Sequence, residues 1–83
     1  MPPDDAASVE AIADAIADYL HRHAMAADSA EGVARWWLGP AHAGVAIEVV
    51  ERALETLVAR GIARRVDLTD GSFLYSLASP TRQ

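Results

Sequence analysis

The feature that most constrains the fold is a long apolar helix that runs into a glycine and then into a β-hairpin. Residues 45–60 carry apolar side chains at helical spacing, and Gly61 follows as a left-handed C-terminal cap. Beyond it, residues 62–67 and 72–77 flank a turn at residues 69–71, whose Asp-Gly pair suits a tight hairpin. This stretch therefore predicts a helix followed by two antiparallel strands.

The helix at 45–60 has one broad apolar face that is expected to build the core. The residues on that face are Ala46, Ile47, Val50, Ala53, Leu54, Leu57 and Val58. In the second hairpin strand, Phe73, Tyr75 and Leu77 alternate with residues of the other face, which is typical of a half-buried strand. One helix face and one strand face are therefore expected to be buried together.

A first helix is predicted to run from Ser8 to the basic residues at 21–23. Ser8 is a good N-cap, and Glu10 lies in the first turn, where the helix dipole favours an anion. Basic groups suit the other end for the same reason. The apolar positions of this helix are Val9, Ile12, Ala13, Ile16 and Leu20.

A second, shorter helix is predicted from Asp28 to Leu38. Asp28 followed by Glu31 forms a capping box, and Gly39-Pro40 stops the helix. Residues 24–27 connect the first two helices, with a short strand as the alternative. Because the third helix begins a few residues after the second, the two form a helix-turn-helix unit.

The order helix, helix, helix, strand, turn, strand over residues 8–77 resembles a winged-helix domain, and residues 50–63 are similar to the recognition helix and first wing strand of bacterial winged-helix regulators. The resemblance implies a mainly α fold with a small two-stranded β-hairpin. Residues 1–7 are expected to be a flexible leader and residues 78–83 a short tail. In that superfamily the third helix enters the DNA major groove and the hairpin touches the backbone. The same fold also serves as a protein–protein module.

The charge balance argues against nucleic-acid binding. Seven basic residues oppose twelve acidic ones, a net charge of −5, whereas nucleic-acid binders usually carry a basic field. The exposed N-terminal part of the third helix offers no bidentate donor for a base. Glu48, Glu51 and Glu55 would instead bring carboxylates toward phosphates, and Arg52 is placed to pair with Glu48.

Two apolar features favour contact with another protein. Val45 and Val49 fall outside the predicted core arc, beside Arg52, so they are expected on the exposed face. The alternative is a rolled helix whose N-terminal half packs against the second helix or a loop. Trp37 is expected in the core. Trp36 lies at the edge of that face, either as an exposed interface anchor or as a cover for the side of a small core.

DNA binding is kept as the alternative function. In that case Arg60, Arg64 and Arg65, around the entry to the hairpin, would grip the DNA backbone while a dimer supplies the remaining contacts. Arg64 and Arg65 point to opposite faces of a strand and do not form one patch together. The competing interpretation is that all three are solubilising charges on a hairpin and a helix C-terminus.

Little in the sequence supports catalysis or metal binding. His21 and His23 are two residues apart on a helix and point away from each other, and His42 has no evident partner. The chain has no cysteine, phosphate-binding glycine loop or cofactor fingerprint, so neither a cofactor nor a small-molecule substrate is expected. No apolar run approaches the ~20 residues that span a bilayer. A cytoplasmic protein without a membrane partner is therefore expected.

The sequence thus predicts a non-catalytic winged-helix module that acts through protein–protein association, as a homodimer or an accessory subunit. Its contact residues would be Trp36, Val45, Val49 and Arg52. The alternative is a DNA-binding transcriptional regulator that uses the third helix and the hairpin arginines. A positive strip joining Arg52, Arg60 and a hairpin arginine would favour DNA, whereas an apolar centre rimmed by glutamates would favour a protein.

Overall fold

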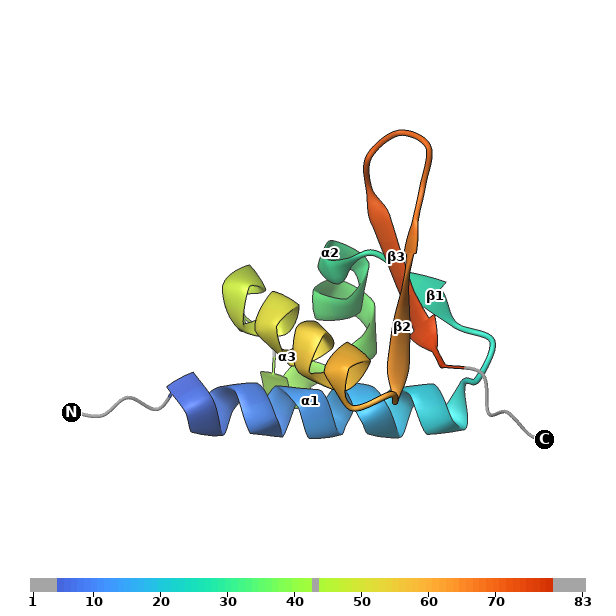
Figure 1. The fold of residues 1–83 in the computed structure, drawn as a ribbon. Helices are drawn as coiled ribbons and strands as arrows, with labels where there is room; N and C mark the ends of the chain where they lie inside the picture. The colour runs from blue at the N-terminus through green and yellow to red at the C-terminus, as the bar shows by residue number, and fades with distance from the viewer. Residues whose placement is uncertain (1–4, 43, 79–83) are drawn as a thin grey trace.

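The computed structural model describes residues 5–42 and 44–78, so residues 1–4 of the predicted leader and 79–83 of the predicted tail lie outside the described residues. The elements in chain order are α1 (Asp5–Arg22), β1 (Ala27–Asp28), α2 (Ala30–Gly32), the π-helical segment η1 (Val33–Trp37), the 3-10 turn η2 (Pro40–His42), α3 (Ile47–Ala59), β2 (Ala63–Asp67) and β3 (Phe73–Leu77). They form a mixed α+β fold. Helices α2 and α3 lie on one side of α1, and the β2–β3 hairpin extends away from it (Figure 1).

Helix α1 begins earlier than predicted. It starts at Asp5, so Ser8 lies inside the helix rather than at its cap, and residues 5–7 belong to the helix rather than to a leader. Alanine is the strongest helix former and an acidic residue suits the positive end of the helix dipole, which explains the extension. The other end, at Arg22, agrees with the prediction.

The cap of the second helix is Ser29, one residue after the predicted position. The Ser29 hydroxyl oxygen accepts a hydrogen bond from the backbone N–H of Gly32, with 3.2 Å between oxygen and nitrogen. Asp28 belongs to β1, and its carboxylate accepts from the backbone N–H of Ser29 at 2.8 Å. The predicted capping box of Asp28 with Glu31 is therefore wrong, because pairing with β3 draws Asp28 into the sheet.

After one turn, α2 widens into η1, which has the i→i+5 hydrogen bonding of a π-helix. Val33 and Trp37 within this segment are buried, as is the next residue, Leu38. Gly39 then takes a φ of 72°, in the left-handed region that favours glycine, and confirms the predicted stop of the helix.

Helix α3 ends as predicted. Gly61 has a φ of 77°, and the backbone N–H of Ile62 donates to the carbonyl oxygen of Leu57 at 2.9 Å. These two features close the C-terminus of the helix in the manner of a left-handed glycine cap.

The apolar face of α3 is largely as predicted. Its fully buried residues are Val50, Ala53, Leu54 and Leu57. Ile47 is half-buried, whereas Ala46 and Val58 are exposed and do not belong to the core. Ala46 lies before the first turn of the helix, and Val58 lies at the edge of the buried arc, which accounts for both differences.

The sheet has three strands in the order β1-β3-β2, with both pairs antiparallel. The hairpin is therefore two strands of a larger sheet, and the alternative of a short strand before the second helix is confirmed as β1. The predicted inward face of β3 is confirmed in part: Tyr75 is buried and Leu77 half-buried, whereas Phe73, on the same face, is exposed near the tip of the hairpin. Gly71, with a φ of 91°, forms the turn between β2 and β3.

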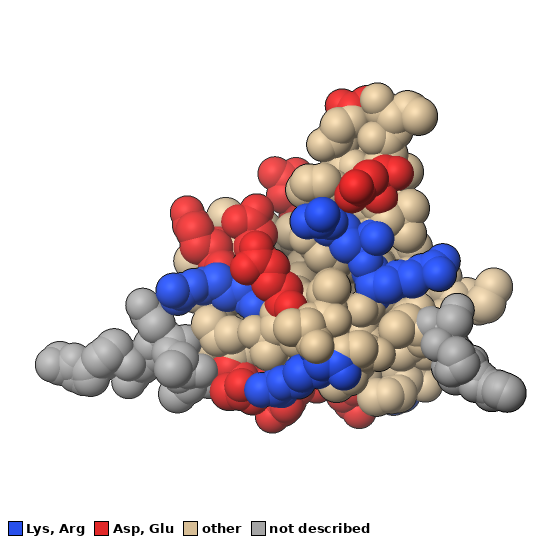
Figure 2. Space-filling view, viewed as in Figure 1, with Lys and Arg blue, Asp and Glu red and all other residues tan. Residues whose placement is uncertain are grey.

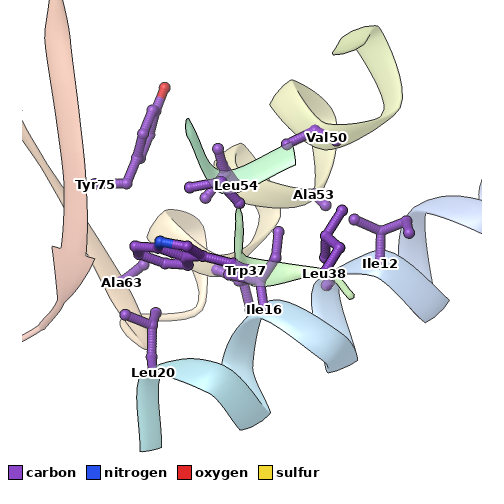
Figure 3. Packing of buried hydrophobic residues seen from close by; sticks show 13 residues of the cluster. Ile12, Ile16, Leu20, Trp37, Leu38, Val50, Ala53, Leu54, Ala63 and Tyr75 are labelled. Carbon is purple, nitrogen blue, oxygen red and sulfur yellow. The ribbon is translucent and has the colours of Figure 1, made fainter. Parts of the chain in front are cut away.

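One hydrophobic core joins the helices to the sheet (Figure 3). Its buried residues are Ile12, Ala13, Ile16, Leu20, Val33, Trp37, Leu38, Val50, Ala53, Leu54, Leu57, Ala63 and Tyr75. The ring of Trp37 stacks on Tyr19 of α1, with 4.8 Å between the ring centroids. Since α1, η1, α3 and both hairpin strands contribute buried side chains, the core fixes α3 and the hairpin relative to each other.

Candidate functional site

The two valines expected on the exposed face of α3 are half-buried. Val45 and Val49 both pack against the hydrophobic core. Val45 lies before the helix, beside Ile12 of α1 in a shallow pocket that also includes His42. The prediction of exposed valines is therefore wrong. The alternative of a packed N-terminal half describes the arrangement better, although the helix beside Val45 is α1 and not the second helix.

Arg52 lies on the exposed face of α3. Its predicted ion pair with Glu48 is absent from the described part of the chain, although the two residues are one helical turn apart. Both side chains are solvated, and an exposed pair of this kind gains little when it forms.

The two adjacent tryptophans have opposite environments. Trp37 is 7% exposed and belongs to the core, as predicted, whereas Trp36 is 69% exposed. Trp36 therefore does not cover the side of the core, and the alternative of an exposed ring applies. Tryptophan is enriched among the residues that dominate binding energy at protein interfaces.

The three hairpin arginines do not act as one group. Arg60 donates to the carboxylate of Glu10 in α1, with 2.7 Å between nitrogen and oxygen. Arg64 and Arg65 are successive residues of β2, which pair with Ser76 and Tyr75 of β3. Arg60 is thus held against α1, while the sheet holds the other two arginines.

Arg65 has two contacts on its own face of the hairpin. Its guanidinium carbon lies 4.4 Å from the centroid of the Phe73 ring. Its Nε atom lies 3.3 Å from a carboxylate oxygen of Asp67. Both contacts are favourable for a cation, so the charge of Arg65 is partly compensated within the hairpin.

An open groove of about 440 Å³ lies between the start of α2, helix α3 and the hairpin. We name it the α3–hairpin groove. Its lining includes Glu31 of α2, Glu51 and Glu55 of α3, and Arg65, Phe73 and Tyr75 of the hairpin. Three carboxylates therefore face one guanidinium. Figure 2 shows acidic side chains gathered over α3, beside the cationic side chains of the hairpin.

Tyr75 combines burial with an unused polar group at this groove. The residue is 6% exposed and lines the groove from β3. Its hydroxyl points away from the ring of Trp37 (Figure 3). Within residues 5–42 and 44–78 it makes no side-chain hydrogen bond. Polar groups of buried residues in folded proteins are nearly always paired, so a ligand group that bonds to this hydroxyl from the groove would be favoured.

The groove could be predicted only in part. The strand alternation placed Phe73 and Tyr75 on one face, and the helical spacing placed Glu51 and Glu55 outside the core. That Glu31 joins them depends on how α2 approaches the hairpin, which no local pattern encodes. The feature of the sequence that indicated a site here is the series of three glutamates on α3, Glu48, Glu51 and Glu55.

The turn of the hairpin carries a titrating group with an altered pKa. The Ser72 hydroxyl donates to the Asp70 carboxylate at 2.6 Å, and the backbone N–H of Ser72 donates to the same oxygen at 3.0 Å. These bonds stabilise the anion and lower the pKa of Asp70 below its ordinary value of 3.8. Asp70 is fully exposed and its contacts are internal to the turn, so it orders the turn and does not form a site.

The histidines are not gathered with other metal-binding side chains. His23 stacks on Tyr19, with 4.3 Å between ring centroids, and His42 lies in the pocket beside Val45. Within the described ranges, no three histidine, aspartate or glutamate side chains lie together in a way that would hold a metal ion.

No protein family, curated protein or solved structure matches this chain. Among the helices that the structure describes, none combines the length and the apolar character needed to cross a membrane.

Proposed function

We propose that the chain is a non-catalytic winged-helix module that acts by binding another protein, as a homodimer or as an accessory subunit of a larger assembly. The element order supports the winged-helix assignment. A helix, a short strand and two helices precede a hairpin, and the first strand joins the hairpin in one antiparallel sheet.

The charge distribution on the surface of α3 and the hairpin carries the functional part of the proposal. The side of α3 that faces the hairpin presents Glu51 and Glu55 to the groove, where a DNA-binding face would present cations to phosphates. Arg60, which could have extended a positive strip, bonds to Glu10 instead. A surface of this sign repels a nucleic acid and is open to a protein.

Trp36 supplies the apolar element of the proposed contact. Its ring is 69% exposed on η1, next to the buried Trp37. A large exposed aromatic ring has few side-chain torsions, so it can enter a pocket of a partner at little cost in side-chain entropy. Of the other proposed contact residues, Val45 and Val49 are half-buried against the core, while Arg52 is exposed on α3.

DNA binding is the second candidate function, because Arg64 and Arg65 lie on the exposed part of the hairpin. Non-specific DNA binding comes mainly from phosphate electrostatics and is strong at low salt. A titration of the protein with random-sequence duplex DNA at low salt therefore separates the two functions. We expect no binding, and binding that weakens steeply with added salt would overturn the proposal.

The protein-contact surface is tested with Trp36→Ala, measured for self-association by sedimentation equilibrium. Met25→Ala is the matched control. It also removes a large apolar side chain, from a residue that is 95% exposed in the loop after α1. We expect the Trp36 variant alone to weaken association. Equal behaviour of both variants and the parent protein would exclude Trp36 as an anchor of self-association.

A further inference from the structure

We propose that the α3–hairpin groove binds an arginine-containing segment of a partner protein. This inference rests on the proposed function, since it names the chemistry of the partner. The juxtaposition that carries it is Tyr75, a buried residue whose hydroxyl makes no hydrogen bond among the described residues, in a groove lined by three carboxylates.

The charge of the groove selects a cation. Glu31, Glu51 and Glu55 oppose the single guanidinium of Arg65, so the lining groups carry a net charge of −2. Arg65 is already compensated by the Asp67 carboxylate at 3.3 Å and by the Phe73 ring at 4.4 Å. The carboxylates on the α2 and α3 walls make none of the described ion pairs, and they are available to an incoming cation.

Tyr75 is the second observation, and it is independent of the charge. Its side chain is 6% exposed, lines the groove and makes no hydrogen bond among the described residues. A tyrosine hydroxyl both donates and accepts. A guanidinium in the groove would donate to it and thereby supply a partner that this hydroxyl lacks among the described residues.

Arginine fits this lining better than lysine. The guanidinium is planar, has five N–H donors and binds carboxylates in a bidentate manner, so it can serve a carboxylate and the tyrosine hydroxyl at once. A volume of about 440 Å³ lies in the range of ordinary ligand sites, which leaves room for one long side chain and adjoining backbone. The α3 wall supplies Glu51 and Glu55, which are one helical turn apart.

The experiment uses the full chain and a fluorescein-labelled peptide of alternating arginine and glycine, measured by fluorescence anisotropy. We expect Glu51→Gln and Glu55→Gln each to weaken binding by roughly fivefold, as loss of a charge-assisted hydrogen bond on a partly solvated wall would do. Glu48→Gln is the matched control: it removes the same charge from α3, at an exposed position outside the groove lining. Its affinity is expected to stay within about twofold of the parent.

Tyr75→Phe distinguishes peptide binding in the groove from non-specific electrostatic attraction of a cationic peptide to an acidic protein. The ring is kept and the hydroxyl has no partner to lose among the described residues, so the free variant should fold normally while its affinity falls by roughly threefold. Equal effects of Glu48→Gln and Glu51→Gln, or an unchanged affinity of Tyr75→Phe, would overturn the inference. A lysine–glycine peptide that binds as tightly as the arginine peptide would also overturn it.

The same samples distinguish this inference from the proposed function. Salt-sensitive binding of duplex DNA would refute the proposed function itself. Association that depends on Trp36, together with peptide binding that ignores the groove substitutions, would leave the proposed function standing and refute the groove alone.

Discussion

Gly32→Ala should destabilise the fold even though alanine is the better helix former. Replacing a glycine inside a helix by alanine ordinarily stabilises the folded state by about 1 kcal/mol, because alanine has the higher helix propensity. At this position, however, an added Cβ would overlap the carboxylate of Asp28. That carboxylate accepts a hydrogen bond from the backbone N–H of Ser29 at 2.8 Å and would have to leave it. Glu31, a wall of the α3–hairpin groove, lies in the same turn, so the substitution also tests what positions the groove.

The size of the effect follows from the two opposing contributions. A hydrogen bond to a charged group contributes about 1.5–3 kcal/mol, which exceeds the helix-propensity gain. The net loss for Gly32→Ala is therefore about 0.5–2 kcal/mol. For a domain of this size, 1 kcal/mol lowers the melting temperature by about 4–8 °C.

The assay is a double-mutant cycle with Asp28→Ala, followed by urea denaturation. Once the carboxylate is absent, Gly32→Ala should stabilise the protein by about 1 kcal/mol, because only the propensity gain remains. The coupling between the two sites should then be about 1.5–3 kcal/mol. A Gly32→Ala variant that is more stable than the parent in both backgrounds would refute the reasoning.

Three further outcomes are expected. Leu54→Ala should lower the free energy of unfolding by about 2–5 kcal/mol, because Leu54 is fully buried, and a smaller loss in urea denaturation would argue against the described core. Arg60→Gln should lower the free energy of unfolding by less than about 1 kcal/mol, since its pair with Glu10 is exposed. In urea denaturation, the Glu10→Gln, Arg60→Gln double variant should be as stable as either single variant. Ser72→Ala should raise the pKa of Asp70 toward 3.8, measured by NMR titration.

The sign of the Asp70 effect follows from linkage. A carboxyl group whose pKa is lowered in the folded state stabilises the fold above the unfolded pKa of 3.8, and this stabilisation is lost as the pH falls through the lower folded value. The Ser72→Ala variant should therefore differ from the parent at neutral pH and converge with it in acid. A titration curve of Asp70 that is unchanged by the substitution would show that the turn hydrogen bonds do not control this pKa.

The helix ends set by glycine were predictable from the sequence, whereas the choice among neighbouring caps was not. Gly39 and Gly61 mark ends that depend on the local backbone alone, and both were placed correctly. Asp28 and Ser29 are both good N-caps. Only the pairing of β1 with β3, which comes from the far end of the chain, decides between them.

The exposure of single residues was harder to predict than the elements that carry them. Val45 lies beside Ile12 of α1, and Val45 and Val49 both pack against the core, while Trp36 in η1 stays in solvent next to the buried Trp37. Arg60 was grouped with the hairpin because it precedes β2, but its partner, Glu10, lies fifty residues earlier. A periodic pattern gives the direction of a side chain within its own element and does not say which element will meet it.

The position of β3 in the middle of the sheet has a consequence for the order of folding. The hairpin pairs neighbouring segments, so β2 and β3 can meet early. Among the described strands β1 pairs with β3 alone, through Ala27 and Asp28 opposite Ser76 and Tyr75. Pairing β1 with β3 closes a loop of more than half of the chain. The loss of chain entropy is larger than for the hairpin, so we expect β1 to join late in folding. Amide hydrogen exchange at Tyr75 and Ser76 should therefore report global opening, while exchange near Gly71 reports only local fluctuations of the turn.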